Sequence, residues 1–141
     1  MSFNLILLPL LTMVFLTFAV WVYLYALRVP ESKRLKMNLD GLQTRIQADK
    51  HLTVSAPVSD NLKNLFEMPV LFYVAAMLAI VLLIQDTLLI RLAWGFVILR
   101  IVHSVVHCTY NRVMHRFIAY LASCLFLILM WIRLATYILM N

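Results

Sequence analysis

The chain has 141 residues and a formal net charge of +6, with 65% hydrophobic residues, 13% charged residues and a mean hydropathy of +0.94. Soluble domains are about 45–50% apolar, so this composition excludes a soluble domain and predicts an integral membrane protein. The basic residues lie near the ends of apolar stretches instead of on one polar face, which argues against nucleic-acid binding.

The apolar stretches predict helices. Only two glycines and four prolines are available for turns, and the apolar runs do not alternate as the strands of a membrane barrel do. The length leaves room for four spans of roughly 20 residues. We therefore expect an all-α membrane protein, a single domain over residues 1–141 with four transmembrane helices in up-down topology.

The first uncharged stretch predicts a span at about residues 4–28. Arg28 is its first charge, and Pro30 is expected to end the helix, because the residue before a proline avoids helical geometry. Residues 29–60 are polar and rich in both charges, and they form the one long loop that we expect.

The second span is expected at about residues 61–84. Asp60, Asn64 and Glu67 share one helical face at its start. Pro69 has no N–H group to bond the carbonyl four residues earlier, so the helix should be kinked beside these polar groups. A kink next to polar side chains indicates a site.

The last two spans are expected at about residues 88–110 and 116–139. Asp86 or Thr87 can cap the third span, and the short turn before it makes the second and third spans antiparallel neighbours. Arg133 lies near enough to the end of the fourth span to reach the membrane surface.

The most informative segment lies at the end of the third span. Arg100, His103, His107 and Asn111 fall on one helical stripe, whereas the intervening residues are mostly apolar. Ionisable groups at membrane depth usually face a bundle interior or a watery cavity and serve a function. Arg100 could also form a structural ion pair, and the two histidines could hydrogen-bond between helices. A metal site is not expected, because no HExxH motif is present.

Lysine and arginine are concentrated in residues 29–60 and in the corner at 112–116, while the other turn and the termini hold few. By the positive-inside rule both basic segments are cytoplasmic and both termini face the opposite side. The polar residues of the second and third spans then gather near the cytoplasmic face.

These residue types suit a small anionic ligand that also carries an amino group. Arginine forks bind carboxylates through two hydrogen bonds, Glu67 can bind an ammonium group, and Asn64 can bond an amide. The set matches a zwitterionic peptide such as glutathione. A lipophilic second substrate could enter from the bilayer between helices.

Two motifs carry a resemblance to a known family. The stretch Asn64-Leu-Phe-Glu67-Met-Pro, followed by Arg100-x-x-His103-Ser-x-x-His107 and later Arg116, resembles the MAPEG family, the membrane-associated proteins of eicosanoid and glutathione metabolism. The resemblance covers nearly the whole chain and is greatest to bacterial members, which implies a bacterial inner membrane as the location.

This resemblance implies a homotrimer of four-helix protomers with glutathione as co-substrate, bound between subunits, and no metal. It implies a membrane glutathione transferase or peroxidase that acts in detoxification on lipophilic electrophiles. Arg116 would be the catalytic residue that stabilises the glutathione thiolate. The implied glutathione-binding residues are Arg28, Lys63, Asn64, Glu67, Arg100, His103, His107 and Tyr120.

Other interpretations remain open from the sequence. Arg28 could contact lipid headgroups, and Tyr120 could be an interfacial aromatic anchor. The family includes a lipid-binding member without transferase activity, so a non-catalytic lipid-binding or scaffold protein is the alternative. A small transporter is disfavoured, because the chain has no internal repeat and no acidic relay in mid-membrane.

Overall fold

The structure, a computed structural model, describes residues 5–37 and 44–140 and contains six helices and no strand within them. In chain order the helices are α1 (Leu7–Arg34), α2 (Arg45–His51), α3 (Ala56–Asn64), α4 (Met68–Val81), α5 (Thr87–Cys108) and α6 (Val113–Met140). Four segments are long and apolar enough to cross a membrane, with α3 and α4 together forming one of them. The prediction of an all-α protein with four membrane spans is confirmed.

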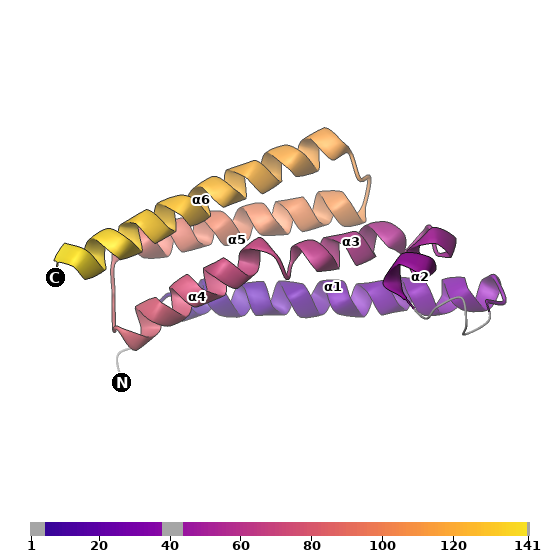
Figure 1. Ribbon diagram of the computed structural model, residues 1–141, viewed down its shortest axis with the longest axis horizontal. Helices are drawn as coiled ribbons and strands as arrows, with labels where there is room; N and C mark the ends of the chain where they lie inside the picture. Colours follow the sequence, from indigo (N-terminus) through magenta and orange to yellow (C-terminus); the bar gives the residue numbers. More distant parts are fainter. Residues whose placement is uncertain (1–4, 38–43, 141) are drawn as a thin grey trace.

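The four spans lie side by side along the long axis of the molecule (Figure 1). The start of α1, the end of α6 and the turn between α4 and α5 lie at one end of the bundle, whereas α2 and the turn between α5 and α6 lie at the other. This is the expected up-down topology. It brings the end of α1, the start of α3 and the end of α5 to the same end of the bundle.

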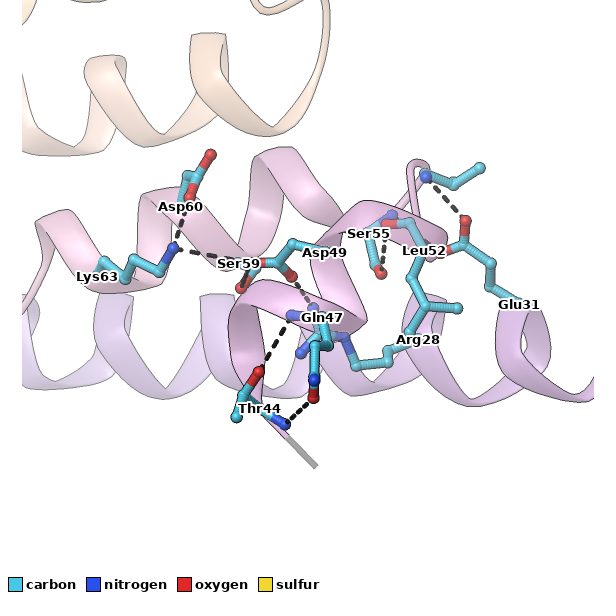
Figure 2. A network of polar contacts seen from close by, with 11 residues as sticks. Arg28, Glu31, Thr44, Gln47, Asp49, Leu52, Ser55, Ser59, Asp60 and Lys63 are labelled. Carbon is cyan, nitrogen blue, oxygen red and sulfur yellow. Dashed lines mark hydrogen bonds and ion pairs between the residues drawn. The ribbon is translucent and has the colours of Figure 1, made fainter. Parts of the chain in front are cut away.

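The sequence predicted that the first helix ends near Arg28, before Pro30. In the structure the helix continues through Pro30 to Arg34. In that turn the buried carboxylate of Glu31 accepts hydrogen bonds from the backbone N–H groups of Val54, at 2.8 Å, and Ser55, at 3.0 Å (Figure 2). A proline inside a helix costs about 3 kcal/mol. Two hydrogen bonds to a charged acceptor, each about 1.5–3 kcal/mol, offset that cost and hold the start of α3 against α1.

The predicted loop of residues 29–60 contains the short helix α2. Thr44 and Gln47 form a capping box, in which the Thr44 hydroxyl accepts from the Gln47 N–H at 3.2 Å and the Gln47 side chain accepts from the Thr44 N–H at 3.3 Å. The T-x-x-Q pattern is a sequence signal for the start of a helix that the loop assignment overlooked. The second span also begins earlier than predicted, at Ala56.

The predicted kink in the second span is a complete break between α3 and α4. The α3 helix ends at Asn64 and α4 begins at Met68, with Pro69 in its first turn. Pro69 cannot donate to the Leu65 carbonyl, so the helix stops where that hydrogen bond would form. The break places the backbone of Glu67 outside both helices.

The closest packing in the bundle joins α5 and α6. Gly95 of α5 faces the ring of Phe126 on α6, and a Cβ atom at Gly95 would lie 2.3 Å from the Phe126 Cδ1 atom. On the other side of α5, the rings of Phe96 and Phe72 stack with their centroids 4.9 Å apart. Small residues let membrane helices approach closely, and this contact fixes how the polar stripe of α5 faces α6.

Replacing Gly95 by alanine should lower the thermal stability of the protein in detergent. The added methyl group overlaps the Phe126 ring, and overpacking costs about 1–3 kcal/mol, which exceeds the gain of roughly 1 kcal/mol in helix propensity. In a Phe126→Leu background the same substitution should be neutral or stabilising, and melting curves of the four proteins measure this coupling. Equal losses in both backgrounds would contradict it.

Asp86 joins α5 to α6 at the end of the bundle opposite α2. Its side chain caps α5 by accepting from the Leu89 N–H at 3.1 Å, and it binds Arg133 of α6 through two hydrogen bonds of 2.7 Å and 3.1 Å. The hydrogen bonds from Arg133 lower the pKa of the Asp86 carboxyl below its usual value, against an opposing effect of burial. Arg133 therefore makes an internal ion pair at this position.

Replacing Asp86 by asparagine should reduce thermal stability at neutral pH, because asparagine keeps the cap but removes the charge. The pKa of Asp86 is lower in the folded state, so its ion pair stabilises the protein above the unfolded value of about 3.9 and is lost as pH falls through the folded value. Melting temperatures of wild type and variant should therefore converge in acid. A constant difference down to the acid limit would contradict the pairing. Asp86→Ala should lower the free energy of unfolding by about 1 kcal/mol more than Asp86→Asn, because alanine also removes the helix cap.

Candidate functional site

Three polar residues of α5 form one buried stripe. Arg100, His103 and His107 follow at spacings of three and four, and 0%, 3% and 2% of their surfaces are exposed. In the described part of the chain, seven buried side-chain nitrogens have no hydrogen-bond partner, and five of them belong to these three residues. Buried polar groups are normally hydrogen-bonded. Their concentration on one stripe makes this part of α5 the candidate site.

The guanidinium group of Arg100 lies against two aromatic rings. Its Cζ atom is 5.3 Å from the ring centroid of Phe96 and 4.8 Å from that of Tyr120. Within residues 5–37 and 44–140, no ion pair to Glu67 or Asp60 forms, although Glu67 acts on Arg100 electrostatically from farther away. Cation–π contacts contribute about 0.5–2 kcal/mol, less than the several kcal/mol that burial of a charge costs. Arg100 therefore retains the capacity to bind an anion.

Arg116, in the first turn of α6, lies at the centre of the polar contacts. Its Nη1 atom donates to the side-chain oxygen of Asn111 at 2.8 Å and to Nε2 of His107 at 3.3 Å. Its backbone carbonyl accepts from Nδ1 of His103 at 2.9 Å. The side chain is half-buried, and Nε and Nη2 have no partner among the described residues. Two donors of Arg116 are therefore available to a ligand.

Asn111 turns the chain between α5 and α6 and orients Arg116. It has a φ of 48°, in the left-handed region that asparagine tolerates better than most residues. Its backbone N–H donates to the carbonyl of Val106 at 2.9 Å, which closes the end of α5. Because the side chain also accepts from Arg116, one residue sets both the turn and the direction of the guanidinium group.

The hydrogen-bond partners define the tautomers of the two histidines. A carbonyl only accepts, so Nδ1 of His103 carries the hydrogen and Nε2 of the neutral ring has a free lone pair. A guanidinium only donates, so Nε2 of His107 accepts and Nδ1 carries the hydrogen. The rings lie 5.6 Å apart, and the His103 ring lies 5.9 Å from that of Tyr120. The stripe thus offers one proton acceptor and several donors.

Two of the predicted ligand residues belong to a second polar group, at the end of α1. Arg28 forms an ion pair with Asp49 of α2, and the same carboxylate accepts from the Ser59 hydroxyl at 3.2 Å (Figure 2). Lys63 lies 3.6 Å from Asp49 and 2.9 Å from Asp60. In the protomer these cations bind carboxylates of the chain, and among the described residues neither Arg28 nor Lys63 contacts a residue of the stripe.

Asn64 and Glu67 flank the break between α3 and α4. Asn64 is half-buried, Glu67 is exposed, and neither side chain has a hydrogen-bond partner among the described residues. Glu67 acts electrostatically on both Arg100 and Tyr120, which places it beside the stripe. Glu67 thus presents a carboxylate near the guanidinium of Arg100, and Asn64 presents a carboxamide at the other side of the break.

Sequence reasoning missed three polar residues of these groups. Asp49 and Glu31 lie in the segment predicted to be a loop, and no pattern in the neighbouring residues indicates which groups they bind. Asn61 is fully buried, donating to Cys108 Sγ at 3.3 Å and accepting from the Ser104 hydroxyl at 3.3 Å. Its position one turn before Asn64, on the predicted site face, could have suggested a contact with another helix. The two hydrogen bonds of Asn61 attach α3 to α5 and so help to position the site.

An apolar cavity of about 390 Å³ lies between α4 and α6, beside the polar stripe. It starts at Met68, next to Glu67, and reaches Cys124, one turn beyond Tyr120. The residues that line it are Met68, Leu71, Cys124, Leu127, Ile128, Trp131 and Ile132. No residue of the stripe lines this cavity. Its size and lining suit the apolar part of a lipid-like molecule.

The comparison with protein families agrees with the geometry. The chain matches the model of the MAPEG family over residues 6–136, a range that includes the whole polar stripe and the break between α3 and α4. The search of curated proteins and the search of solved structures returned no match. The family match covers nearly the whole chain and agrees with the four apolar spans. The chain belongs to the MAPEG family and is a multi-pass integral membrane protein.

Proposed function

We propose that this protein is a membrane glutathione transferase that joins the thiol of glutathione to lipophilic electrophiles. The observation that carries the proposal is the buried stripe of α5, where Arg100, His103 and His107 have donors and acceptors without partners. Arg116 stands beside the stripe with two further donors free. Membership of a family that includes glutathione transferases supports the same conclusion.

The proposed chemistry depends on Arg116. A thiol with a pKa of roughly 8.5 is mostly protonated at neutral pH, and an adjacent guanidinium stabilises the thiolate, which is the nucleophile. The thiolate attacks an electrophilic carbon, forms a C–S bond and expels halide or opens an epoxide. With a lipid hydroperoxide, two glutathione molecules would give the disulfide, an alcohol and water.

Each polar group has a proposed partner on glutathione. Arg100 binds a carboxylate through its planar fork, Glu67 binds the ammonium group, and Asn64 bonds a peptide amide. Tyr120 and the two histidines complete the site. The apolar cavity between α4 and α6 receives the lipophilic substrate, which enters from the bilayer.

We further propose that the site is completed in a homotrimer, near the cytoplasmic face of a bacterial inner membrane. Arg28 and Lys63 make no contact with the stripe among the described residues of the protomer, and binding of glutathione between subunits would allow the cations of a neighbouring protomer to contribute. The basic residues of the α2 end support the cytoplasmic orientation of that end. No metal takes part in the proposed reaction.

The proposal is tested by adding glutathione to the purified protein in detergent. Glutathione at a hundredfold excess over its dissociation constant should stabilise the folded protein by about 2.7 kcal/mol, which raises the melting temperature. The protein should also conjugate chlorodinitrobenzene. Protein that shows neither a thermal shift nor turnover would contradict the proposal and favour a non-catalytic lipid-binding protein, for which the apolar cavity is the supporting feature. Mass spectrometry of copurified lipid would test that alternative.

A further inference from the structure

The lone pair on Nε2 of His103 is a buried acceptor that has no role in the proposed function so far. Nδ1 of the same ring donates to the backbone carbonyl of Arg116, which holds the ring in place and sets its tautomer. Nε2 is buried and has no donor within the described residues. Nε2 of His103 is thus an acceptor without a partner, whereas the unpartnered nitrogens of Arg100 and His107 are donors. A ligand with a proton to donate would find its acceptor at this atom.

The groups that face His103 come from two helices. Arg100 and His107 lie on its own helix, α5, and Arg116 and Tyr120 lie on α6. Arg100 and Arg116 are cations, and His107 has its hydrogen on Nδ1 because its Nε2 accepts from Arg116. Two carboxylates act on these neighbours from farther away: Glu67, at the break before α4, acts on Arg100 and Tyr120, and Asp60 of α3 acts on His107. Among these neighbours, only His103 presents a free imidazole lone pair.

We propose that His103 is the general base that removes the thiol proton of glutathione and returns it later in the reaction. This inference rests on the proposed transferase function and assigns the proton that Arg116 cannot accept, because a guanidinium has no lone pair to offer. The geometry on which it depends is the tautomer set by the Arg116 carbonyl, which leaves Nε2 as the proton acceptor.

The proposed step is balanced in protons and electrons. The S–H bond breaks, its electron pair stays on sulfur, and the proton moves to Nε2 of His103. The imidazolium is stabilised by its Nδ1–H bond to the Arg116 carbonyl, and the thiolate by the free donors of Arg116. When the thiolate opens an epoxide, a C–S bond forms, a C–O bond breaks, and the alkoxide takes the proton from Nε2. With an aryl chloride, chloride leaves and the proton passes to water.

The wild-type protein alone provides the first test. If His103 keeps the thiol proton, binding of glutathione at neutral pH should produce the ultraviolet absorption band of a thiolate without release of a proton to the buffer. If Arg116 alone stabilises the thiolate, about one proton per glutathione should be released, because the free thiol is mostly protonated. Calorimetry in two buffers of different ionisation enthalpy measures this number. A thiolate band with one proton released, or turnover without a thiolate band, would overturn the inference.

The second test replaces His103 by asparagine. The asparagine amide can still donate to the Arg116 carbonyl from the position of Nδ1, but it offers no base at the position of Nε2. Without this base, only thiol that ionises by itself can react, so kcat for chlorodinitrobenzene should fall by up to about 30-fold at neutral pH, the ratio of thiol to thiolate for a pKa of roughly 8.5. The remaining rate should rise tenfold per pH unit until the bound thiol is ionised.

Two controls separate the base from a merely structural or binding role. S-methylglutathione has no thiol proton, so the change of its affinity in His103→Asn measures only the binding contribution of His103, and this change should be much smaller than the loss of rate. His115→Asn changes an exposed histidine of α6 that bonds only to Tyr110 at 3.1 Å, and it should leave rate and pH profile unchanged. An unaltered pH profile in His103→Asn, or a loss of S-methylglutathione affinity equal to the loss of rate, would overturn the inference. Wild-type protein without any turnover would instead count against the proposed transferase function.

Discussion

Replacing Arg116 by alanine should lower kcat for glutathione conjugation by about 10²- to 10³-fold. Arg116 is a cation with both a fixed orientation and free donors, because Asn111 and His107 hold its Nη1 atom while Nε and Nη2 have no partner in the described chain. Removing a preorganised donor from a developing anion typically costs about 2.7–4 kcal/mol of transition-state stabilisation. Steady-state kinetics with chlorodinitrobenzene measure the loss.

The controls for this prediction retain the fold. Arg112→Ala removes an exposed arginine in the same turn and should leave kcat unchanged. Arg116→Lys keeps the charge but loses the planar fork, so kcat should recover only in part. Because Arg116→Ala leaves His107 Nε2 without a donor, thermal stability should fall by about 1 kcal/mol, a small effect beside the loss of rate. A wild-type kcat in Arg116→Ala would assign thiolate stabilisation to another group.

Replacing Arg100 by methionine should change stability and ligand binding in opposite directions. Arg100 is fully buried, and its three side-chain nitrogens have no hydrogen-bond partner among the described residues. Replacement of buried charged groups by apolar residues of similar volume often stabilises a protein, by about 1–4 kcal/mol, and here no partner charge is left behind. The melting temperature of the ligand-free variant should therefore rise.

The same substitution should weaken glutathione binding severely. Losing one member of a buried charge pair costs about 2–5 kcal/mol, which corresponds to about a 30- to 5,000-fold rise in the dissociation constant. Titration calorimetry measures this change. Arg112→Met makes the same replacement at an exposed position and should alter neither property. Lower stability of Arg100→Met would show that Arg100 has a structural partner in the assembled protein, and an unchanged affinity would exclude it from the ligand site.

The Arg116→Ala and Arg100→Met variants should differ in which property they change, the reaction rate or the stability of the folded protein. Arg116 is held by neighbours within its own protomer, so its loss should affect chiefly the reaction. Arg100 packs against the rings of Phe96 and Tyr120 and makes no ion pair within the described residues, so its loss should stabilise the folded state. A buried charge without a partner lowers the stability of the folded protein but remains able to bind a ligand of opposite charge.

The sequence predicted best what depends on local periodicity. Arg100, His103 and His107 lie on one buried stripe because residues three and four apart share a helical face in any α-helix. The break beside Pro69 follows equally from one residue, since proline lacks the N–H group that the helix needs. The cap at Asp86 is a third example, because an N-cap needs only the residue itself and the following turn.

The sequence could not predict contacts between distant segments. Pro30 indicates a helix end, and only the reach of Glu31 to Val54 and Ser55 explains why the helix continues. Arg28 and Lys63 have the charge expected of glutathione ligands, yet both pair with Asp49 in the protomer, and Lys63 also pairs with Asp60; both carboxylates lie in the segment predicted to be a loop.

By itself, the sequence determined the membrane class, the four helical spans and the residue types of the polar stripe, because hydropathy and helical repeat are properties of neighbouring residues. Only the tertiary structure decided which nitrogen of His103 is free, which donors of Arg116 are engaged and which cations are already paired. Each of these depends on the partner that a different helix supplies, and the position of that helix is set by packing such as that of Gly95 against Phe126.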